Sequence, residues 1–148
     1  MTFDIGAPRD GDRAAWQELF AGYNAFYGRE WPPERYEQAW REFRRGERVH
    51  ALVARLDGRP VGLTHYLFHP STTSGDACYL QDLFTAAEVR GRGVARALIA
   101  AVADVARDRG CERVYWHTHE GNATARRLYD QVAENRGFIV YVRPLAAG

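Results

Sequence analysis

Two long apolar runs joined by a two-residue turn constrain the fold more than any other feature of the chain. Residues 50–56 and 61–69 flank Asp57-Gly58, and an Asp-Gly pair favours a tight hairpin because its residues adopt positive φ readily. The two runs are therefore predicted to be adjacent antiparallel strands. Since the sheet contains this hairpin, it cannot be wholly parallel.

Helical and strand-like patterns continue on both sides of this hairpin. Asp10 or Asp12 is expected to cap the first helix, and Pro32-Pro33 is expected to open the second. Helices are predicted at residues 10–27, 32–46, 94–109 and 122–132, and further strands at residues 3–5, 77–85, 113–118 and 138–143. A hairpin followed by strands that alternate with helices predicts a mixed sheet with helices on both faces.

The composition indicates one globular domain spanning residues 1–148. Hydrophobic residues make up 46% of the chain, which is enough for a core, and the net charge of +1 argues against a nucleic-acid binder. The chain has no leader pattern and no apolar stretch long enough to span a membrane, so a cytoplasmic protein is expected. Cys78 and Cys111 fit no metal-binding pattern and are predicted to be buried, reduced thiols.

The chain has no lysine, and all 20 of its basic residues are arginine. This absence excludes a Walker-type phosphate loop, which requires a lysine. It also excludes Schiff-base chemistry and a lysine general base supplied by the protein itself. Phosphate groups would have to be held by arginines and backbone amides.

A glycine-rich segment, Arg90-Gly91-Arg92-Gly93-Val94-Ala95, lies between a predicted strand and the start of a predicted helix. Glycines let the backbone approach an anion, and the amides of a helix N-terminus favour negative charge there. Arg96 stands where the dinucleotide-binding fingerprint needs a small residue, so that fold is not indicated. Taken alone, the segment also fits a tight turn with solvated arginines.

Several motifs in a fixed order resemble the GNAT superfamily of N-acetyltransferases. They are Tyr79–Thr85, Arg90-x-x-Gly93-x-Ala95, Asn122-x-x-Ala125-x-x-x-Tyr129 and Gly137-Phe138, and the agreement extends along essentially the whole chain. The strand 79–85 and residues 114–129 are similar to the polyamine and histone acetyltransferase branch. The resemblance implies an α/β (α+β) fold, with a mixed, mostly antiparallel sheet of about six or seven strands and about four helices on its two faces.

This resemblance implies transfer of an acetyl group from acetyl-coenzyme A to a primary amine by direct attack on the thioester. Backbone groups of Leu83, Phe84 and Thr85 would bind the pantetheine arm and the acetyl carbonyl. Tyr129 would protonate the departing thiolate, and Asn122 and Ala125 would contact the coenzyme. The pyrophosphate would be held by the glycine-rich segment and its helix start, Arg90, Gly91, Arg92, Gly93, Val94, Ala95 and Arg96.

The base that takes the proton of the amine is left open by the sequence. Gln81 occupies a position that is glutamate in the polyamine branch, and an amide is no useful base, while Asp82 is expected on the opposite face of that strand. His117 and His119 share a face of the next strand, so one of them, or Asp82 through water, would relay the proton. A metal site formed by these histidines with Glu120 lacks a further ligand and is not expected.

The remaining histidines and aromatic residues have simpler expectations. His65 and His69 are expected to be strand residues with satisfied rings. Most aromatic residues of the first two helices are expected in the core, but a cluster at the turn between them would hold a cationic amine. The candidate acceptor residues are Tyr23, Phe26, Tyr27, Trp31 and Gln81.

The expected acceptor is a small amine of the polyamine or amino-acid kind, with an aminoglycoside-like amine left open. The family resemblance also makes a homodimer an option. Three alternatives remain at this point: a non-catalytic acyl-coenzyme A-binding regulatory module, a protein N-terminal or lysine acetyltransferase, and an arginine-rich interaction domain. Acidic residues are interleaved with the arginines throughout the chain, which argues against the interaction domain.

Overall fold

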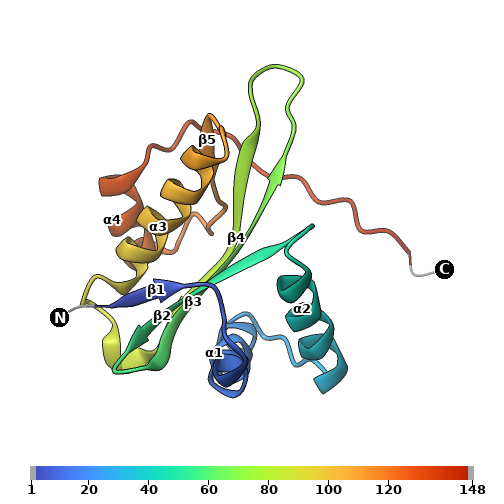
Figure 1. Cartoon of the computed structure of the whole chain (residues 1–148). Coiled ribbons are helices and arrows are strands. Elements are labelled where there is room, and N and C mark those ends of the chain that lie inside the picture. Colours follow the sequence, from blue (N-terminus) through green and yellow to red (C-terminus); the bar gives the residue numbers. More distant parts are fainter. Residues whose placement is uncertain (1–2, 147–148) are drawn as a thin grey trace. The chain divides into compact units, whose positions relative to one another are not determined.

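The computed structural model describes residues 3–146, in two compact units that divide after His117. The first unit contains a five-stranded sheet whose strands lie in chain order, with three antiparallel pairs followed by one parallel pair (Figure 1). The predicted mixed, mostly antiparallel sheet is thus confirmed. Its strands are β1 (Asp4–Gly6), β2 (His50–Leu56), β3 (Arg59–His69), β4 (Ala77–Thr85) and β5 (Arg113–Tyr115).

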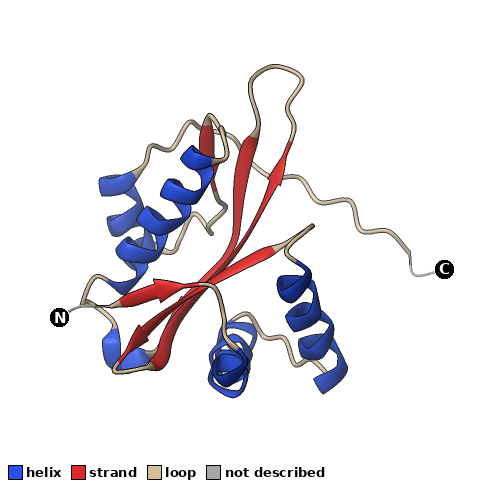
Figure 2. Ribbon diagram, viewed as in Figure 1, coloured by secondary structure: helices blue, strands red, loops and turns tan. Residues whose placement is uncertain are grey.

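The prediction of six or seven strands is wrong for the described residues. β5 ends at Tyr115, three residues earlier than expected, and residues 138–143 form no strand (Figure 2). A strand requires hydrogen bonds from a neighbouring strand, and this segment pairs with none among residues 3–146. Its side chains are accordingly exposed: Phe138 by 90% and Tyr141 by 88%.

Residues 3–146 contain four α-helices, as predicted, although the first begins differently. Neither Asp10 nor Asp12 caps α1 with its side chain, because the Asp12 carboxylate binds Arg55 instead. Asp10–Asp12 forms a short 3-10 helix, η1, before α1, and Ala87–Val89 forms another, η2. The α-helices are α1 (Arg13–Phe26), α2 (Pro33–Arg45) and α3 (Val94–Asp108) in the first unit, and α4 (Ala123–Val132) in the second.

In the first unit α1 and α2 cover one face of the sheet and α3 covers the other (Figure 1). Leu63 on β3 packs into the core beneath α1 and α2. Its neighbour Gly62 faces α3, and a Cβ atom there would lie 2.8 Å from Val94 Cγ1 and 3.1 Å from Leu98 Cδ1. Only glycine therefore lets the start of α3 approach the sheet this closely.

The core on the α1 and α2 face is largely aromatic. Trp16 is fully buried, and its ring contacts four other aromatic side chains besides a histidine. This confirms that most aromatic residues of the first two helices are core residues. The buried members of this cluster are Trp16, Phe20, Tyr36, Trp40, Val53 and Leu63.

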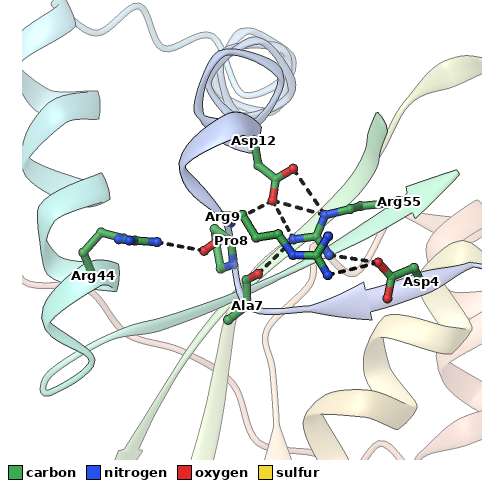
Figure 3. A network of polar contacts seen from close by, with 7 residues as sticks. All are labelled: Asp4, Ala7, Pro8, Arg9, Asp12, Arg44 and Arg55. Atoms are coloured by element: carbon green, nitrogen blue, oxygen red, sulfur yellow. Dashed lines mark hydrogen bonds and ion pairs between the residues drawn. The ribbon is translucent and has the colours of Figure 1, made fainter. Parts of the chain in front are cut away.

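A buried ion pair anchors the start of α1 to β2 (Figure 3). The Arg55 side chain is 1% exposed, and its Nη2 donates to Asp12 Oδ2 at 2.5 Å and to the Ala7 carbonyl at 2.9 Å. A second donor, Nη1, reaches Asp4 Oδ2 at 3.3 Å. Burial alone would raise the pKa of Asp12, but hydrogen bonds from Arg55 and the Arg9 amide lower it overall.

The remaining structural expectations are local ones. Cys78 and Cys111 are both free thiols, as predicted, but only Cys78 is buried; Cys111 follows the end of α3 and is partly exposed, so that part of the prediction is wrong for it. In the second unit Asn122 Oδ1 accepts a hydrogen bond from the Ala125 amide at 3.4 Å, so the predicted cap of α4 is confirmed. Within residues 3–146, none of the helices combines the length and the apolar character needed to cross a bilayer.

Candidate active site

The second half of β4 has one open edge. β5 pairs only with residues 77–79 of β4, whereas β4 continues to Thr85 along β3. Leu83, Phe84 and Thr85 therefore have no ladder partner on their β5 side among the described residues. Unpaired strand backbone can bind an extended ligand through its N–H and C=O groups. This edge fits the pantetheine arm that the sequence assigns to these three residues.

A β-bulge interrupts β4 at Gln81. His65 on β3 pairs with Asp82 and Tyr66 pairs with Leu80, which leaves exposed Gln81 without a partner. Residues three apart normally face opposite sides of a strand, but the extra residue brings Tyr79 and Asp82 to the same side. The bulge thus places the Asp82 carboxylate on the α1 side of β4, beside His65.

A chain of directional hydrogen bonds holds the Asp82 carboxylate. Trp16 Nε1 donates to His65 Nε2 at 3.0 Å, so that nitrogen carries no proton. His65 Nδ1 therefore carries the proton and donates to Asp82 Oδ2 at 2.9 Å. Both ring nitrogens of His65 are thus satisfied, as expected for this strand residue. The Asp82 side chain is 13% exposed, so its carboxylate is fixed and still reachable.

Tyr23 lies close to the same carboxylate. It is on the face of α1 that also carries Trp16 and Phe20, because residues three, four and seven apart share one side of a helix. Burial, followed by the charge of Asp82, raises the pKa of Tyr23 well above its usual range, so the phenol stays protonated next to the carboxylate.

A second polar pair lies on the same face of the sheet. Tyr79 Oη and His117 Nδ1 are 3.2 Å apart, and burial together with the charge of Asp82 raises the pKa of Tyr79. Tyr79 also packs against Tyr115, whose hydroxyl is 2.7 Å from His69 Nε2. His69 Nδ1 is 2.9 Å from the Pro70 carbonyl, so the ring of His69 is satisfied as expected. His117 is exposed, so this pair extends from the vicinity of Asp82 to the surface.

The glycine-rich segment forms the turn into α3. Gly91 and Gly93 have φ values of 78° and 86°, which only glycine adopts at no steric cost. The N-cap residue Gly93 has no side chain to cap α3, and the first amides of any helix lack an acceptor within the helix itself. The Arg90 guanidinium lies 5.6 Å from the centre of the Phe84 ring. The segment thus offers amides and positive charge at the end of β4, an arrangement that fits a pyrophosphate.

The aromatic cluster at the end of α1 contains a cation of the protein itself. Arg29 Cζ lies 5.6 Å from the ring centre of Tyr23, 5.2 Å from that of Tyr27 and 5.9 Å from that of Trp31. The expected cage for a cationic amine is therefore already occupied by a guanidinium, and the sequence interpretation overlooked Arg29. Phe26 is 70% exposed and packs only against Tyr27 in this cluster.

The remaining predicted site residues lie in the second unit. Positions 122, 125 and 129 recur at helical spacing, so Asn122, Ala125 and Tyr129 lie on one side of α4. His119 precedes this helix, and its carbonyl accepts a hydrogen bond from the Asn122 amide at 3.0 Å. Across residues 3–146 no group of three or more His, Cys, Asp or Glu side chains could hold a metal ion.

Comparison with known proteins supports these assignments of fold and family. The model of the acetyltransferase (GNAT) family matches residues 16–133. Thialysine N-epsilon-acetyltransferase of Caenorhabditis elegans is 33% identical over 84 residues, which span 57% of this chain and 52% of that protein. D-amino-acid N-acetyltransferase HPA3 of Saccharomyces cerevisiae is 32% identical over 136 residues, covering 89% of this chain and 84% of the relative.

A solved structure shares the fold at lower sequence identity. AAC(6')-Iy, in complex with the bisubstrate analogue CoA-S-monomethyl-acetylneamine, superimposes with a TM-score of 0.86 at 19% identity, covering 99% of this chain and all of that one. The family match covers most of the chain and includes β4, the glycine-rich turn and α4. The chain therefore belongs to the acetyltransferase (GNAT) family.

Proposed function

We propose that this protein transfers the acetyl group of acetyl-coenzyme A to a primary amine on a small molecule, polyamine-like or amino-acid-like. The single observation that carries the proposal is the open edge of β4, which runs from the fixed Asp82 carboxylate to the glycine-rich turn. A coenzyme arm bound along this edge would bring its thioester close to the face of the sheet that carries Asp82, where the amine would bind. Two relatives are named for acetylating thialysine and D-amino acids, which supports a small amine.

In the proposed reaction the amine nitrogen attacks the carbonyl carbon of the thioester. A C–N bond forms, the carbonyl electrons move to oxygen, and backbone N–H groups of residues 83–85 stabilise the oxyanion. The C–S bond then breaks, and the sulfur takes a proton from the Tyr129 hydroxyl. The products are an N-acetylated amine and free coenzyme A. An acceptor that arrives as an ammonium loses two protons: one leaves before the attack and passes to solvent, and the other leaves the attacked nitrogen and balances the proton that Tyr129 gives to sulfur.

The proton on the amine is a substantial part of the barrier. An alkyl ammonium with a pKa of about 10.4 lies roughly 4.6 kcal/mol from its reactive form at neutral pH. Asp82, held by His65, would bind the ammonium and pass its proton through water. The Tyr79–His117 pair next to this carboxylate offers a route for the proton to the surface.

Removing each candidate base tests this assignment. Asp82→Asn keeps the shape of the side chain and is expected to lower kcat/KM for the amine by about 100-fold or more, without changing the Kd of acetyl-coenzyme A. The pH profiles of His117→Ala and His119→Ala identify which histidine, if either, takes part in the relay. Full activity in Asp82→Asn would exclude the carboxylate.

The general-acid role of Tyr129 is tested by Tyr129→Phe. We expect kcat to fall by about 100-fold or more, because the thiolate would leave without its proton, while the Kd of acetyl-coenzyme A stays the same. Tyr141→Phe, at an exposed position in the same unit, is the matched control. An unchanged kcat in Tyr129→Phe would contradict the proposed role.

A panel of amines, measured by release of free thiol, tests the activity as a whole. Residues 1–148 are proposed to act as one acetyltransferase domain, alone or as a homodimer, and the mass of the native protein distinguishes these states. Thermal stabilisation by acetyl-coenzyme A with no thiol release from any amine would instead indicate a non-catalytic binding module. No stabilisation would point away from coenzyme binding altogether.

A further inference from the structure

Arg29 is held in place by more than its aromatic neighbours. Its Nε donates to Asn24 Oδ1 at 3.2 Å, and its backbone amide donates to the Asn24 carbonyl at 2.8 Å. Asn24 is fully buried, and its amide nitrogen donates in turn to the Tyr36 hydroxyl at 3.2 Å. The guanidinium is thus fixed from the core of the domain, which lowers the entropy that binding would cost.

The outer edge of this guanidinium is available. Arg29 is exposed, and its Nη atoms have no hydrogen-bond partner within the described part of the chain. Glu30 and Glu34, the nearest acidic residues along the chain, form no ion pair with it among these residues. The planar fork of an arginine whose Nη groups are free matches a carboxylate in bidentate geometry.

Tyr23 connects this cation to the anion described above. Its hydroxyl lies near Asp82, whose charge helps to raise the pKa of Tyr23, while the Arg29 guanidinium lies against the ring of the same residue. One tyrosine side chain therefore separates a fixed negative group from a fixed positive group on the same face of the sheet. This dipolar pair is complementary to a molecule with an ammonium group at one end and a carboxylate at the other.

Building on the proposed acetyl transfer, we infer that Arg29 binds the carboxylate of the acceptor and makes this enzyme select amino acids over polyamines. The ammonium of the acceptor lies toward Asp82, and its carboxylate lies toward Arg29. A polyamine would instead bring a second cation toward the guanidinium, and this repulsion would weaken its binding. The aromatic cluster serves to position Arg29 and does not itself bind a cationic substrate.

The test uses pairs of acceptors that differ only in the carboxylate. β-Alanine, γ-aminobutyrate and ε-aminocaproate are compared with their primary amides by thiol release, with thialysine and spermidine as further acceptors. In wild-type protein we expect a lower KM for at least one acid than for its amide. Arg29→Gln keeps a donor for Asn24 and is expected to raise that acid's KM by about tenfold, leaving kcat and the amide's KM unchanged.

Two further variants separate charge recognition from structural damage. Arg29→Lys should recover part of the preference for the acid, because it restores the charge without the planar fork. Arg35→Gln, which removes a guanidinium 4.9 Å from the Trp31 ring centre, is the matched control and should change the acid's KM little. Added salt should raise the KM for the acid in the wild type and have less effect in Arg29→Gln.

The outcomes distinguish this inference from the proposed function. Equal KM values for acids and amides in the wild type, or equal losses for both in Arg29→Gln, would overturn the role of Arg29 while leaving acetyl transfer intact. A preference for spermidine over every acid would do the same. If no amine in either series releases thiol, the proposed transfer fails, and the carboxylate role fails with it.

Discussion

The two faces of the sheet are held to their helices by different means. On the α3 face the contacts are mainly apolar and close. Because Gly62 has no side chain, Val94 and Leu98 can pack directly against the backbone of β3. On the α1 and α2 face buried polar groups connect the layers: Arg55 binds Asp12, and Trp16 binds His65. Of the five buried polar or charged residues within positions 3–146, four belong to this second face: Asp12, Asn24, Arg55 and His65.

This difference matches the two halves of the proposed chemistry. Acetyl-coenzyme A is the same in every turnover and can be held by backbone groups, which a closely packed helix start and two glycines present well. The acceptor amine must be chosen from among many and must lose a proton, tasks that require oriented side chains. Substitutions on the α3 face should therefore affect coenzyme binding, whereas those on the α1 face should affect the amine.

The largest loss of stability is expected when the buried ion pair on the α1 and α2 face is broken. Arg55→Met leaves the Asp12 carboxylate buried without its cation, and the free energy of unfolding should fall by about 3–5 kcal/mol. Urea denaturation measures this loss. Arg107→Gln breaks an exposed pair with Asp104 and should cost at most about 1 kcal/mol. A similar small loss for Arg55→Met would show that the buried pair is not essential to this face.

A smaller loss is expected when the apolar face is overpacked. Gly62→Ala places a methyl group against Val94 and Leu98 and should lower the free energy of unfolding by about 1–3 kcal/mol. Because Val94 is the first residue of α3, acetyl-coenzyme A binding should weaken as well. Adding Val94→Ala to this variant should restore much of the stability. If the double variant is no more stable than Gly62→Ala, steric contact is not the cause.

A substitution in the turn before α3 should cost less stability than overpacking of the α3 face. Gly93→Ala forces a side chain into positive φ, at a cost of about 1–2 kcal/mol, and should raise the KM for acetyl-coenzyme A without changing the preference among amines. Gly11→Ala, at a glycine with open space and no positive φ, is the control. A change in amine preference in Gly93→Ala would contradict the assignment of coenzyme binding to one face and amine binding to the other.

The smallest effect is a change in pH dependence. Because the pKa of Asp12 is lowered from its ordinary value of 3.8, its contribution to stability is present above that value and is lost as the pH falls through the depressed pKa. Asp12→Asn should therefore be less stable at neutral pH and lose less stability on acidification. Urea midpoints from neutral to acidic pH measure both slopes, with Asp104→Asn as the exposed control. Parallel slopes for wild type and Asp12→Asn would contradict this linkage.

The sequence predicts those elements whose causes are local. The Asp57-Gly58 hairpin, the Asn122 cap and the order of strands and helices follow from neighbouring residues. Asp12 fails as a cap because its partner Arg55 lies 43 positions away in the chain. Residues 138–143 have the composition of a strand, but composition supplies no neighbour to pair with.

Part of the candidate site could also be predicted, because some of its residues are neighbours in the sequence. The glycine-rich turn is a continuous motif, so its residues can be recognised together. The network at Asp82 joins three separate segments, and neither Trp16 nor His65 signals it alone. Two consecutive polar residues, Gln81 and Asp82, do break the alternation of β4 and mark the bulge. Aromatic residues on both sides of Arg29 in the sequence also indicated its environment, because Tyr23, Tyr27 and Trp31 are its neighbours in space as well.

The bulge at Gln81 also limits how this site could arise or disappear during evolution. No single substitution would move Tyr79 and Asp82 to opposite sides of β4, because their common side depends on the number of residues between them. Removing Gln81 altogether would restore regular pairing and turn one of the two away from α1. A chain that lost Gln81 alone would keep its sheet. The Asp82 carboxylate and the Tyr79–His117 pair would then no longer lie on the same side of β4.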